Sequence, residues 1–330
     1  MHLFTIPALL CPFHTTLHDD KLRIDSHTRQ FLLKFSLTDG EQYLHYCSQN
    51  FATMIARSYP YGDFEDLAAW CDMNSLLFLL DDDLDETSKM GKEDLIAFEA
   101  QFMEILLTKG EPVFQPTNPL LKGLADIWKR MCARSDNWFQ QRIIQGFRDM
   151  FRGGWWQFEK LSNQQLPSLK EYCEIRQFLG AANLATDSLP LTAQLHLPLA
   201  MYDHPEIVRL TEYARNAICY SNDLFSLSKE MDKSNQATFN LVTILQREHG
   251  ISIQDAIHAT VEMHDDIIRA FLLLEKEIYN IEPSLNDQLK KFVSGLKHLM
   301  KGNIVWSTYE TTRYPHLSEQ EEGLYLAIAG

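Results

Sequence analysis

The chain has 330 residues, of which 45% are hydrophobic, and it carries 45 acidic against 30 basic residues for a formal net charge of −15. A chain of this length and apolar content can bury a large core. The acidic balance argues against a nucleic-acid backbone or an anionic membrane surface as a partner. A ligand that carries phosphates would therefore have to be bound through metal ions and a few placed cations.

The six cysteines form no Cys-x-x-Cys pair and no Cys/His cluster, which is typical of buried thiols in a reducing compartment. The first residues have no basic segment and are interrupted by Pro7 and Pro12, so they make a poor signal peptide. No stretch stays apolar for the roughly 18 residues that a transmembrane helix needs. We therefore expect a cytoplasmic protein without a membrane-inserted segment.

In chain order, the predicted elements are almost all helices. Residues 1–40 contain prolines and polar turn residues, which predicts an N-terminal strap. Beyond them, the predicted helices span residues 41–59, 66–86, 92–107, 120–134, 137–161 and 169–183. The fifth of these is expected to be interrupted at Gly153 and Gly154. Strand signals are almost absent, so the expected fold class is all-α, a single-domain helical bundle of ten or more helices.

An abrupt change of character stands out at the end of the second predicted helix. Five apolar residues, 76–80, pass directly into five acids within residues 81–86. On a helix, Asp81 and Asp85 lie one turn apart, as do Asp82, Asp85 and Glu86. Like charges at this spacing cost roughly 0.2–0.5 kcal/mol per pair, and a hard cation such as Mg²⁺ reverses that balance. A solvated helix end is the simpler alternative, but it would not need so apolar an approach.

An arginine on the predicted helix 169–183 allows two interpretations. In the structural one, Arg176 pairs with an acid nearby or on a facing helix, while Gly180, Ala181 and Ala182 let helices pack closely. In the functional one, the glycine weakens the helix by about 1 kcal/mol, so the helix can kink and present backbone carbonyls to a cavity.

A second polar pattern favours the functional interpretation. Asn222, Ser226 and Glu230 follow each other at steps of four, so they drift only about 80° around a helix. They present an amide oxygen, a hydroxyl and a carboxylate in one line, which are suitable ligands for a second hard-metal site. Lys229 lies next to them as a point charge for a phosphate. Such a triad also arises by chance, so its weight comes from its combination with the acid run.

At these residues the chain resembles the class I terpene synthases, or terpene cyclases, of microbial type. Residues 81–86 resemble their aspartate-rich DDxxD/E motif, and residues 222–230 are similar to their NDxxSxxxE motif at every defining position. Arg176 lies 46 residues before Asn222, where the pyrophosphate-sensing arginine of that family is expected. The resemblance covers most of the chain, and its motifs occur in the right order.

The C-terminal part adds to the resemblance. Arg313 and Tyr314 resemble the Arg-Tyr pair that closes over the diphosphate, and Trp306 stands where an aromatic cavity residue is expected. One departure is Phe239, which occupies a position where many relatives have His before Asn-Leu-Val. The five-acid run also leaves open which of its acids bind metal.

The resemblance implies a mechanism that these residue types can carry. Three Mg²⁺ ions would bind the diphosphate of a linear prenyl substrate and stabilise the departing pyrophosphate, so that an allylic cation forms without a protein nucleophile. The implied metal ligands are Asp81, Asp82, Asp85, Glu86, Asn222, Ser226 and Glu230. The residues implied to bind the diphosphate are Arg176, Lys229, Arg313 and Tyr314. Gly180, four residues after Arg176, takes the effector position, whose carbonyl faces the new cation. The expected aromatic lining is Phe78, Phe178 and Trp306, for each of which core packing is an equal alternative.

Three other functions fit these residues less well. A chain-elongating prenyl diphosphate synthase would have a second aspartate-rich motif, and a protonation-initiated cyclase would need Asp-x-Asp-Asp, which is not found. A helical binding or scaffold protein would leave Arg176, Arg313-Tyr314 and the second triad as coincidence. The family favours a sesquiterpene made from farnesyl diphosphate, with a diterpene from geranylgeranyl diphosphate as the alternative. It also implies one domain over residues 1–330, with a strap at 1–40 and a closing segment at 300–330, and a homodimer.

Overall fold

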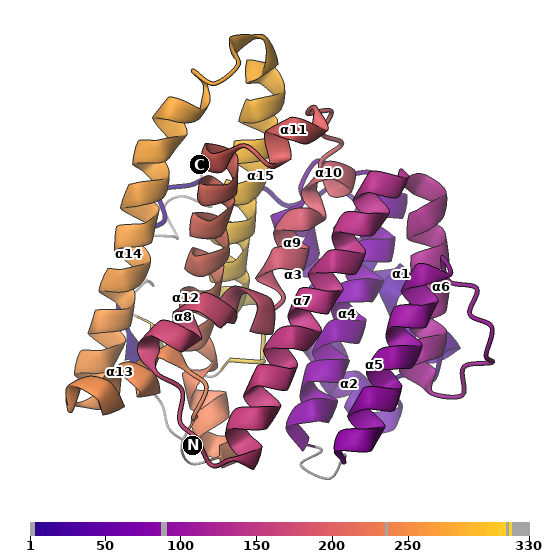
Figure 1. The fold of residues 1–330 in the computed structure, drawn as a ribbon, viewed down its shortest axis with the longest axis horizontal. Coiled ribbons are helices and arrows are strands. Elements are labelled where there is room, and N and C mark those ends of the chain that lie inside the picture. The colour runs from indigo at the N-terminus through magenta and orange to yellow at the C-terminus, as the bar shows by residue number, and fades with distance from the viewer. Residues whose placement is uncertain (1–3, 87–90, 235–236, 315–316, 319–330) are drawn as a thin grey trace. The chain divides into compact units, whose positions relative to one another are not determined.

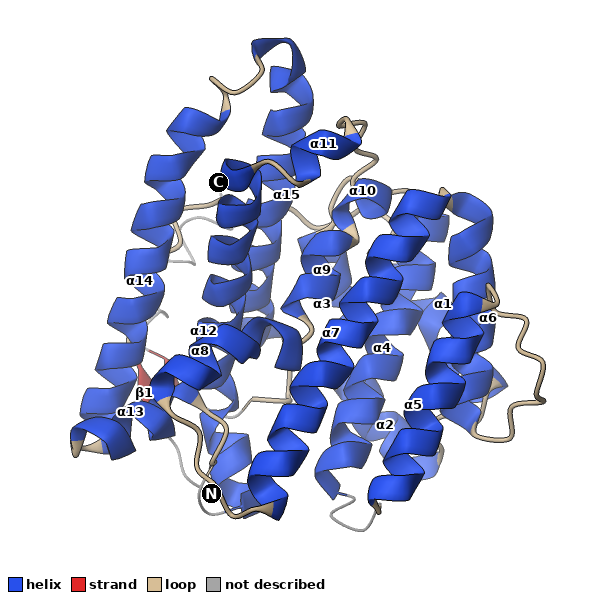
Figure 2. Ribbon diagram, viewed as in Figure 1, coloured by secondary structure: helices blue, strands red, loops and turns tan. Residues whose placement is uncertain are grey.

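The computed structural model describes residues 4–86, 91–234, 237–314 and 317–318, without the side chains of residues 83–86, 232–234 and 317–318. Over these residues most of the chain is helical, which confirms the all-α prediction (Figure 2). The described strands are β1 (Thr5–Ile6) and β2 (Leu317–Ser318), which form one short parallel pair. The chain divides into two compact units.

The first unit, which we call the α4 unit, comprises Thr16–Arg148 and Asp187–Gln194. Its central element is α4 (Phe64–Glu86), a helix of 23 residues without Gly or Pro. Around it lie α1 (Lys21–Lys34), α3 (Phe51–Ser58), α6 (Pro119–Arg134) and α10 (Leu189–Thr192), all in contact with α4. The unit also contains α2 (Gly40–Ser48) and α5 (Lys92–Leu107), which packs on α6.

The second unit, the α12 unit, comprises Met1–Thr15, Asp149–Thr186 and Leu195–Gly330. The chain passes between the units within α7 (Asn137–Ser162) and within α9 (Ala182–Asp187). The central helix is α12 (Pro205–Ser234), which α14 (Ile253–Ile278) follows along its length (Figure 1). Helix α12 also contacts α8 (Leu169–Leu179), α11 (Leu199–Tyr202), α13 (Leu241–His249) and α15 (Asn286–Val305). The 3₁₀ turn η1 (Pro283–Leu285) precedes α15, and the π-helical turn η2 (Trp306–Glu310) follows it.

Two helix predictions were too long, and both helices break at a residue with a positive φ. The predicted helix 41–59 is divided into α2 and α3 by Asn50, whose φ is 57°. The predicted helix 169–183 ends at Leu179, and Ala181 has a φ of 53° before α9 begins. Asparagine tolerates the left-handed region better than most residues, which explains the first break locally. The second break involves an alanine and needs support from elsewhere.

The predicted interruption of α7 was wrong, because the helix continues through Gly153 and Gly154. A Cβ added to Gly153 would lie 3.0 Å from the backbone nitrogen of Leu179 on α8. Gly153 therefore allows two backbones to approach closely and does not end the helix. Gly154 has nothing within 4 Å of its added Cβ.

The N-terminal residues follow two different courses. Residues 21–34, predicted as part of a strap, form α1 in the α4 unit. The segment before Thr15 belongs to the α12 unit, where the Leu10 amide donates to the Asp265 carboxylate at 2.9 Å and Lys301 Nζ donates to the Cys11 carbonyl at 3.1 Å. These bonds fasten the segment to α14 and α15.

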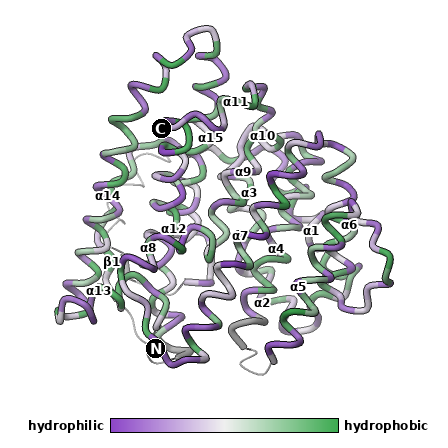
Figure 3. The backbone as a smooth tube through the Cα atoms, viewed as in Figure 1, coloured by the Kyte–Doolittle hydropathy of each residue, from purple (hydrophilic) through white to green (hydrophobic). Residues whose placement is uncertain are grey.

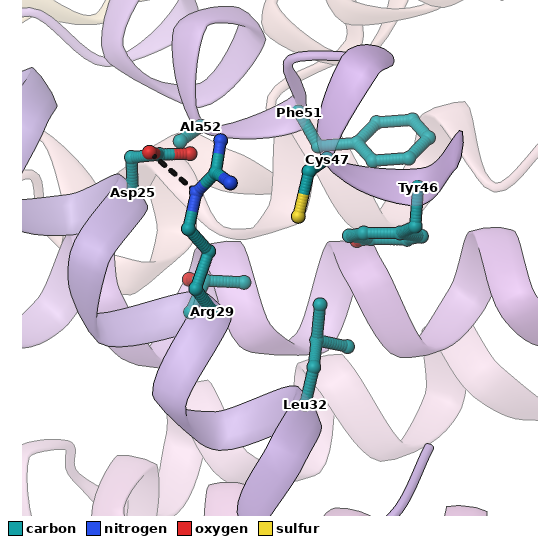
Figure 4. Close-up of a pocket in the computed structure, with 8 residues that line it drawn as sticks. Asp25, Arg29, Leu32, Tyr46, Cys47, Phe51 and Ala52 are labelled. Atoms are coloured by element: carbon teal, nitrogen blue, oxygen red, sulfur yellow. Dashed lines mark hydrogen bonds and ion pairs between the residues drawn. The ribbon is translucent and has the colours of Figure 1, made fainter. Parts of the chain in front are cut away.

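Polar and apolar residues are mixed along the described helices (Figure 3), and none of these helices is both long and apolar enough to span a bilayer. All six cysteines are free, as the sequence predicted. Figure 4 shows a small cavity in the α4 unit, where Arg29 Nε donates to Asp25 at 2.7 Å. Its volume of about 10 Å³ has room for about one water and is far too small for a prenyl chain.

Candidate active site

The second predicted metal motif lies on α12 and forms a connected set of hydrogen bonds. The Ser226 hydroxyl donates to Glu230 Oε1, and Asn240 Nδ2 donates to Glu230 Oε2 at 3.2 Å. Asn240 caps the N-terminus of α13 and also donates to the backbone carbonyl of Asp223 at 2.8 Å. The carboxylate of Glu230 is therefore oriented from two sides, by its own helix and by the start of α13.

Arg176 lies beside the first residue of this motif. It is 7% exposed, and its Nε donates to Asp223 Oδ1 at 2.8 Å while Nη2 donates to Asn222 Oδ1 at 2.9 Å. The acid that pairs with it is on the facing helix α12. Burial alone would lower the pKa of Arg176, but the charge of Asp223 holds that pKa well above its usual value. Arg176 thus pairs with an acid on a facing helix, as the structural interpretation expected. The same contact places its guanidinium at the predicted metal motif.

Asp223 is the residue that the sequence reasoning missed. It is 1% exposed and accepts from the Tyr172 hydroxyl at 2.9 Å and from the Leu241 amide at 3.0 Å, in addition to Arg176. It links α8, α12 and the start of α13. The sequence does show an acid directly after Asn222. Because Asp223 is not part of the series 222, 226 and 230, its side chain points away from the line of ligands and toward another helix.

Two environments in this region shift the pKa of the groups they surround. Burial and, to a smaller extent, the charge of Asp223 raise the pKa of Glu230 to about 7. Burial also raises the pKa of Tyr172, so its hydroxyl stays protonated and can donate to Asp223. Two carboxylates, those of Glu230 and Asp223, thus lie near one guanidinium, that of Arg176, so an additional cation would be attracted to this region.

Gly180 is needed here because of a close approach. A Cβ added to it would lie 2.2 Å from Arg176 Nη1, well inside van der Waals contact. The Gly180 amide caps α8 by donating to the Arg176 carbonyl at 2.9 Å. The helix does end at this glycine, and the guanidinium of Arg176 packs over the place where a side chain would be.

The C-terminal pair reaches the same group of residues. The Tyr314 hydroxyl accepts from Asn222 Nδ2 at 3.2 Å, and the guanidinium carbon of Arg313 lies 5.9 Å from the centre of the Tyr314 ring. Trp306 is fully buried, meets Tyr314 edge-on at 5.7 Å between ring centres and begins η2. Such π-helical turns are rare and often occur at functional sites. Arg176, Asn222 and Tyr314 therefore form one hydrogen-bonded chain.

Other predicted site residues lie in the α4 unit. Phe78, in the α4 unit, stacks on Phe51 with 4.2 Å between ring centres, as a core residue would. In the same unit Asp81 is exposed and Asp82 is half-buried, and the side chains predicted at Asp85 and Glu86 lie outside the described residues.

Two further candidates lie in the α12 unit. Lys229 is half-buried on α12. The ring of Phe178 on α8 lies 4.9 Å from the guanidinium of the exposed Arg152, which favours a packing role over a lining role.

A family model described as terpene synthase family 2, C-terminal metal binding, matches residues 72–270, which is more than half of the chain. The chain belongs to terpene synthase family 2. It is therefore an enzyme, a terpene cyclase, and the matched span contains both predicted metal motifs and Arg176.

Relatives of this terpene synthase match along nearly its whole length. It is 29% identical to (+)-T-muurolol synthase ((2E,6E)-farnesyl diphosphate cyclizing) of Roseiflexus castenholzii, with 97% of each chain covered. It is 27% identical to germacrene A synthase of Nostoc punctiforme, covering 97% of this chain and 98% of that one. Two solved structures share its fold. The first is the SVS_A2 protein from ancestral sequence reconstruction, with a TM-score of 0.80 and 20% identity, covering 95% of this chain and 94% of that one. The second is a-eudesmol synthase, with a TM-score of 0.78 and 20% identity, covering 91% of this chain and 98% of that one.

The residues on α12 fit the metal that the family name implies. Among the described side chains, no three acids, histidines or cysteines gather at a metal-binding distance. The donor set is instead one amide, one hydroxyl and one carboxylate, all oxygen ligands of the kind that hard divalent cations prefer. A divalent cation at these oxygens would favour the ionised form of Glu230, whose pKa the protein alone raises.

Proposed function

We propose that this terpene synthase binds farnesyl diphosphate with Mg²⁺, releases pyrophosphate and cyclises the remaining cation to a sesquiterpene. The observation that carries the proposal is the hydrogen-bonded chain from Arg176 through Asn222 to Tyr314. It brings together three residues that the sequence assigns to diphosphate binding, metal binding and closure. The choice of a C15 substrate is supported by the first relative, whose name states that it cyclises farnesyl diphosphate.

In this proposal Mg²⁺, in three ions, supplies the positive charge that stabilises the pyrophosphate as it leaves. The ligands would be Asn222, Ser226 and Glu230 on α12, and Asp81, Asp82, Asp85 and Glu86 on α4. The chain's own cations, Arg176, Lys229 and Arg313, with the Tyr314 hydroxyl, donate hydrogen bonds to the diphosphate oxygens. Asp223 keeps the Arg176 guanidinium oriented for this role, and Asn240 does the same for the Glu230 carboxylate.

After ionisation, the protein has to orient a carbocation and exclude water. The backbone carbonyl of Gly180 is proposed to face the cation. Trp306 is proposed to face it with its aromatic ring, worth about 0.5–2 kcal/mol. Phe78 and Phe178 are the weaker candidates, because their rings make packing contacts. Of these, Trp306 has the best support, because it packs directly against Tyr314.

The test is Mg²⁺-dependent release of pyrophosphate, with analysis of the hydrocarbons formed from geranyl, farnesyl and geranylgeranyl diphosphates in parallel. We expect cyclic C15 products from farnesyl diphosphate as the main outcome. Turnover of geranylgeranyl diphosphate alone would replace the sesquiterpene proposal by a diterpene one.

Two variants test the metal ligands. We expect Asn222→Ala and Asp82→Ala each to lose most turnover while the helical content stays unchanged. Asn163→Ala and Asp203→Ala are matched controls, since both residues are exposed and lie outside the motifs. Full activity in both ligand variants would rule out the two-motif metal scheme.

A cytoplasmic location and a homodimer complete the proposal. Both come from the family resemblance. Light scattering on the purified protein should give twice the chain mass of 38.3 kDa, and the chain mass itself would contradict the dimer.

A further inference from the structure

The break between α8 and α9 needs an external support. Helix α8 ends at Leu179, Gly180 caps it, and Ala181 adopts a φ of 53° before α9 starts at Ala182. An alanine in the left-handed region is disfavoured by contact of its Cβ with the backbone, and such a conformation persists only where surrounding contacts impose it.

Arg215 on α12 provides contacts on both sides of this break. Its Nε donates to Thr186 Oγ1 at 2.7 Å, and its Nη1 donates to Gln177 Oε1 at 3.3 Å. Gln177 belongs to α8, three residues before Gly180, and Thr186 belongs to α9, five residues after Ala181. Because the guanidinium is planar and rigid, the two bonds fix the spacing of the two acceptors.

The acceptor on α9 is itself held in place. Thr186 is 3% exposed, and its hydroxyl donates to the Asn183 carbonyl at 3.0 Å, which leaves its lone pairs for Arg215. Both acceptors are neutral oxygens, so these two bonds set geometry and do not neutralise charge. Arg215 also lies outside every motif that the sequence analysis singled out.

The position of the break controls the surroundings of Arg176. Gly180 is so close to the Arg176 guanidinium that even a Cβ would overlap Nη1, at 2.2 Å. A rotation of the backbone at Gly180 would therefore displace the guanidinium, which also holds Asn222 Oδ1 at 2.9 Å. By holding Gln177 and Thr186, Arg215 thus helps to keep the hydrogen bond between Arg176 and Asn222 in place.

We propose that Arg215 is a positioning residue of the cyclisation, which clamps α8 and α9 so that Arg176 and the Gly180 carbonyl keep one orientation. The inference rests on the proposed function, since it takes Arg176 to bind diphosphate and Gly180 to face the cation. Arg215 does not touch the substrate in this scheme. Its loss should therefore disturb the reaction of the bound substrate more than its binding.

The test uses Arg215→Lys. Lysine keeps the positive charge, but its single ammonium group cannot bind the Gln177 and Thr186 oxygens at the same time. Thr186→Val and Gln177→Leu remove one acceptor each with little change of shape. Arg209→Lys is the matched control, because Arg209 lies on the same helix and is exposed. For Arg215→Lys we expect kcat to fall about tenfold with KM within about twofold, together with a larger share of acyclic products.

A second measurement follows the break directly. The Gly180 and Ala181 amides donate to the carbonyls of Arg176 and Phe178, at 2.9 and 3.0 Å. Their hydrogen exchange should be faster in Arg215→Lys, while the amides of α14 exchange as in the wild type. An arginine that only stabilises the fold would lower the melting temperature and leave kcat and the product mixture of the folded enzyme unchanged, which would overturn the inference.

The two proposals fail in different ways. A wild-type protein that releases no pyrophosphate from any prenyl diphosphate would contradict the proposed function. A wild-type protein that does so, together with an Arg215→Lys variant of equal kcat, equal products and equal exchange at Gly180 and Ala181, would contradict the clamp alone.

Discussion

Two aspartate–arginine pairs, each with a buried aspartate, look alike in isolation and differ in their surroundings. In the α4 unit, Asp72 is fully buried and accepts from Arg130 Nη2 at 2.7 Å and from the Thr28 hydroxyl at 2.8 Å. In the α12 unit, Asp223 accepts from Arg176 at 2.8 Å and from the Tyr172 hydroxyl at 2.9 Å. Each aspartate sits on the central helix of its unit and binds an arginine and a hydroxyl from neighbouring helices.

The difference lies in what else each arginine touches. Arg130 continues to Asp126, which binds Lys34 at the surface, so this network ends in solvent. Arg176 continues to Asn222, which binds Tyr314. A buried ion pair therefore does not mark a functional site by itself, and the second partner of the arginine distinguishes the structural network from the one that we propose to be catalytic.

The largest expected effect comes from breaking the structural pair. Asp72→Ala removes two hydrogen bonds to a buried carboxylate, from Arg130 and Thr28, and should lower the free energy of unfolding by about 3 kcal/mol. Urea denaturation measures this loss. The kcat of the protein that remains folded should equal that of the wild type, and a hundredfold lower kcat would contradict the distinction between the two pairs.

Asp223→Asn breaks the other pair more gently, because an amide oxygen can still accept one bond from Arg176 or Tyr172. The orientation of Arg176 should be lost, and kcat should fall about a hundredfold, in the range seen when one preorganised donor is removed from an active site. Pyrophosphate release measures kcat, and urea denaturation of the same sample shows whether the fold is retained. A variant with wild-type kcat would show that Asp223 has no part in positioning Arg176.

Much of the fold could be predicted because the helical patterns are long and regular. The helix 92–107 was predicted to the residue, and the start and end of α6 and α7 were each within one residue. The errors fall where tertiary contacts decide. Gly153 looks like a helix breaker, but its lack of a side chain serves the approach of α8. Ala181 has no local preference for the conformation it adopts.

For the candidate site, the sequence predicts the proposed ligands on α12 but not the residues that hold them in place. Asn222, Ser226 and Glu230 can be found from a four-residue step alone. Asp223 and Asn240 act through partners 47 and 10 residues away in the chain, which no spacing on one helix reveals. The contacts of Arg215 could not be predicted from any sequence pattern, because its acceptors Gln177 and Thr186 are brought together only by the break between α8 and α9.

A pair of glycine variants sharpens the comparison at Arg176. Gly180→Ala places a Cβ 2.2 Å from Nη1 and should displace the guanidinium, with a loss of about ten- to a hundredfold in kcat. Gly154→Ala is the matched control, because its added Cβ meets nothing within 4 Å, and it should stabilise α7 by about 0.5–1 kcal/mol. Equal kcat in the two variants would mean that Arg176 can move without consequence.

The raised pKa of Glu230 gives a prediction for pH. Metal binding needs the ionised carboxylate, so the Mg²⁺ concentration for half activity should rise up to about tenfold for each pH unit below 7. Without Mg²⁺, the free energy of unfolding depends on pH in the opposite direction. The folded state holds the Glu230 proton that the unfolded state loses near pH 4.5, so the free energy of unfolding falls as the pH rises from 4.5 toward 7. Glu230→Gln should remove both trends, and persistence of the Mg²⁺ trend in that variant would assign it to another group.

The smallest effect is expected at Phe239, the position where the chain departs from the family resemblance. Its backbone carbonyl accepts from the Tyr172 hydroxyl at 2.8 Å, while its ring meets Trp156 edge-on with 5.6 Å between ring centres. The part of Phe239 that supports Asp223, through Tyr172, is thus the backbone, which any residue supplies. Phe239→His should change kcat by less than about threefold, which is the size of one aromatic edge contact. A tenfold change would show that the side chain at this position also acts on Tyr172.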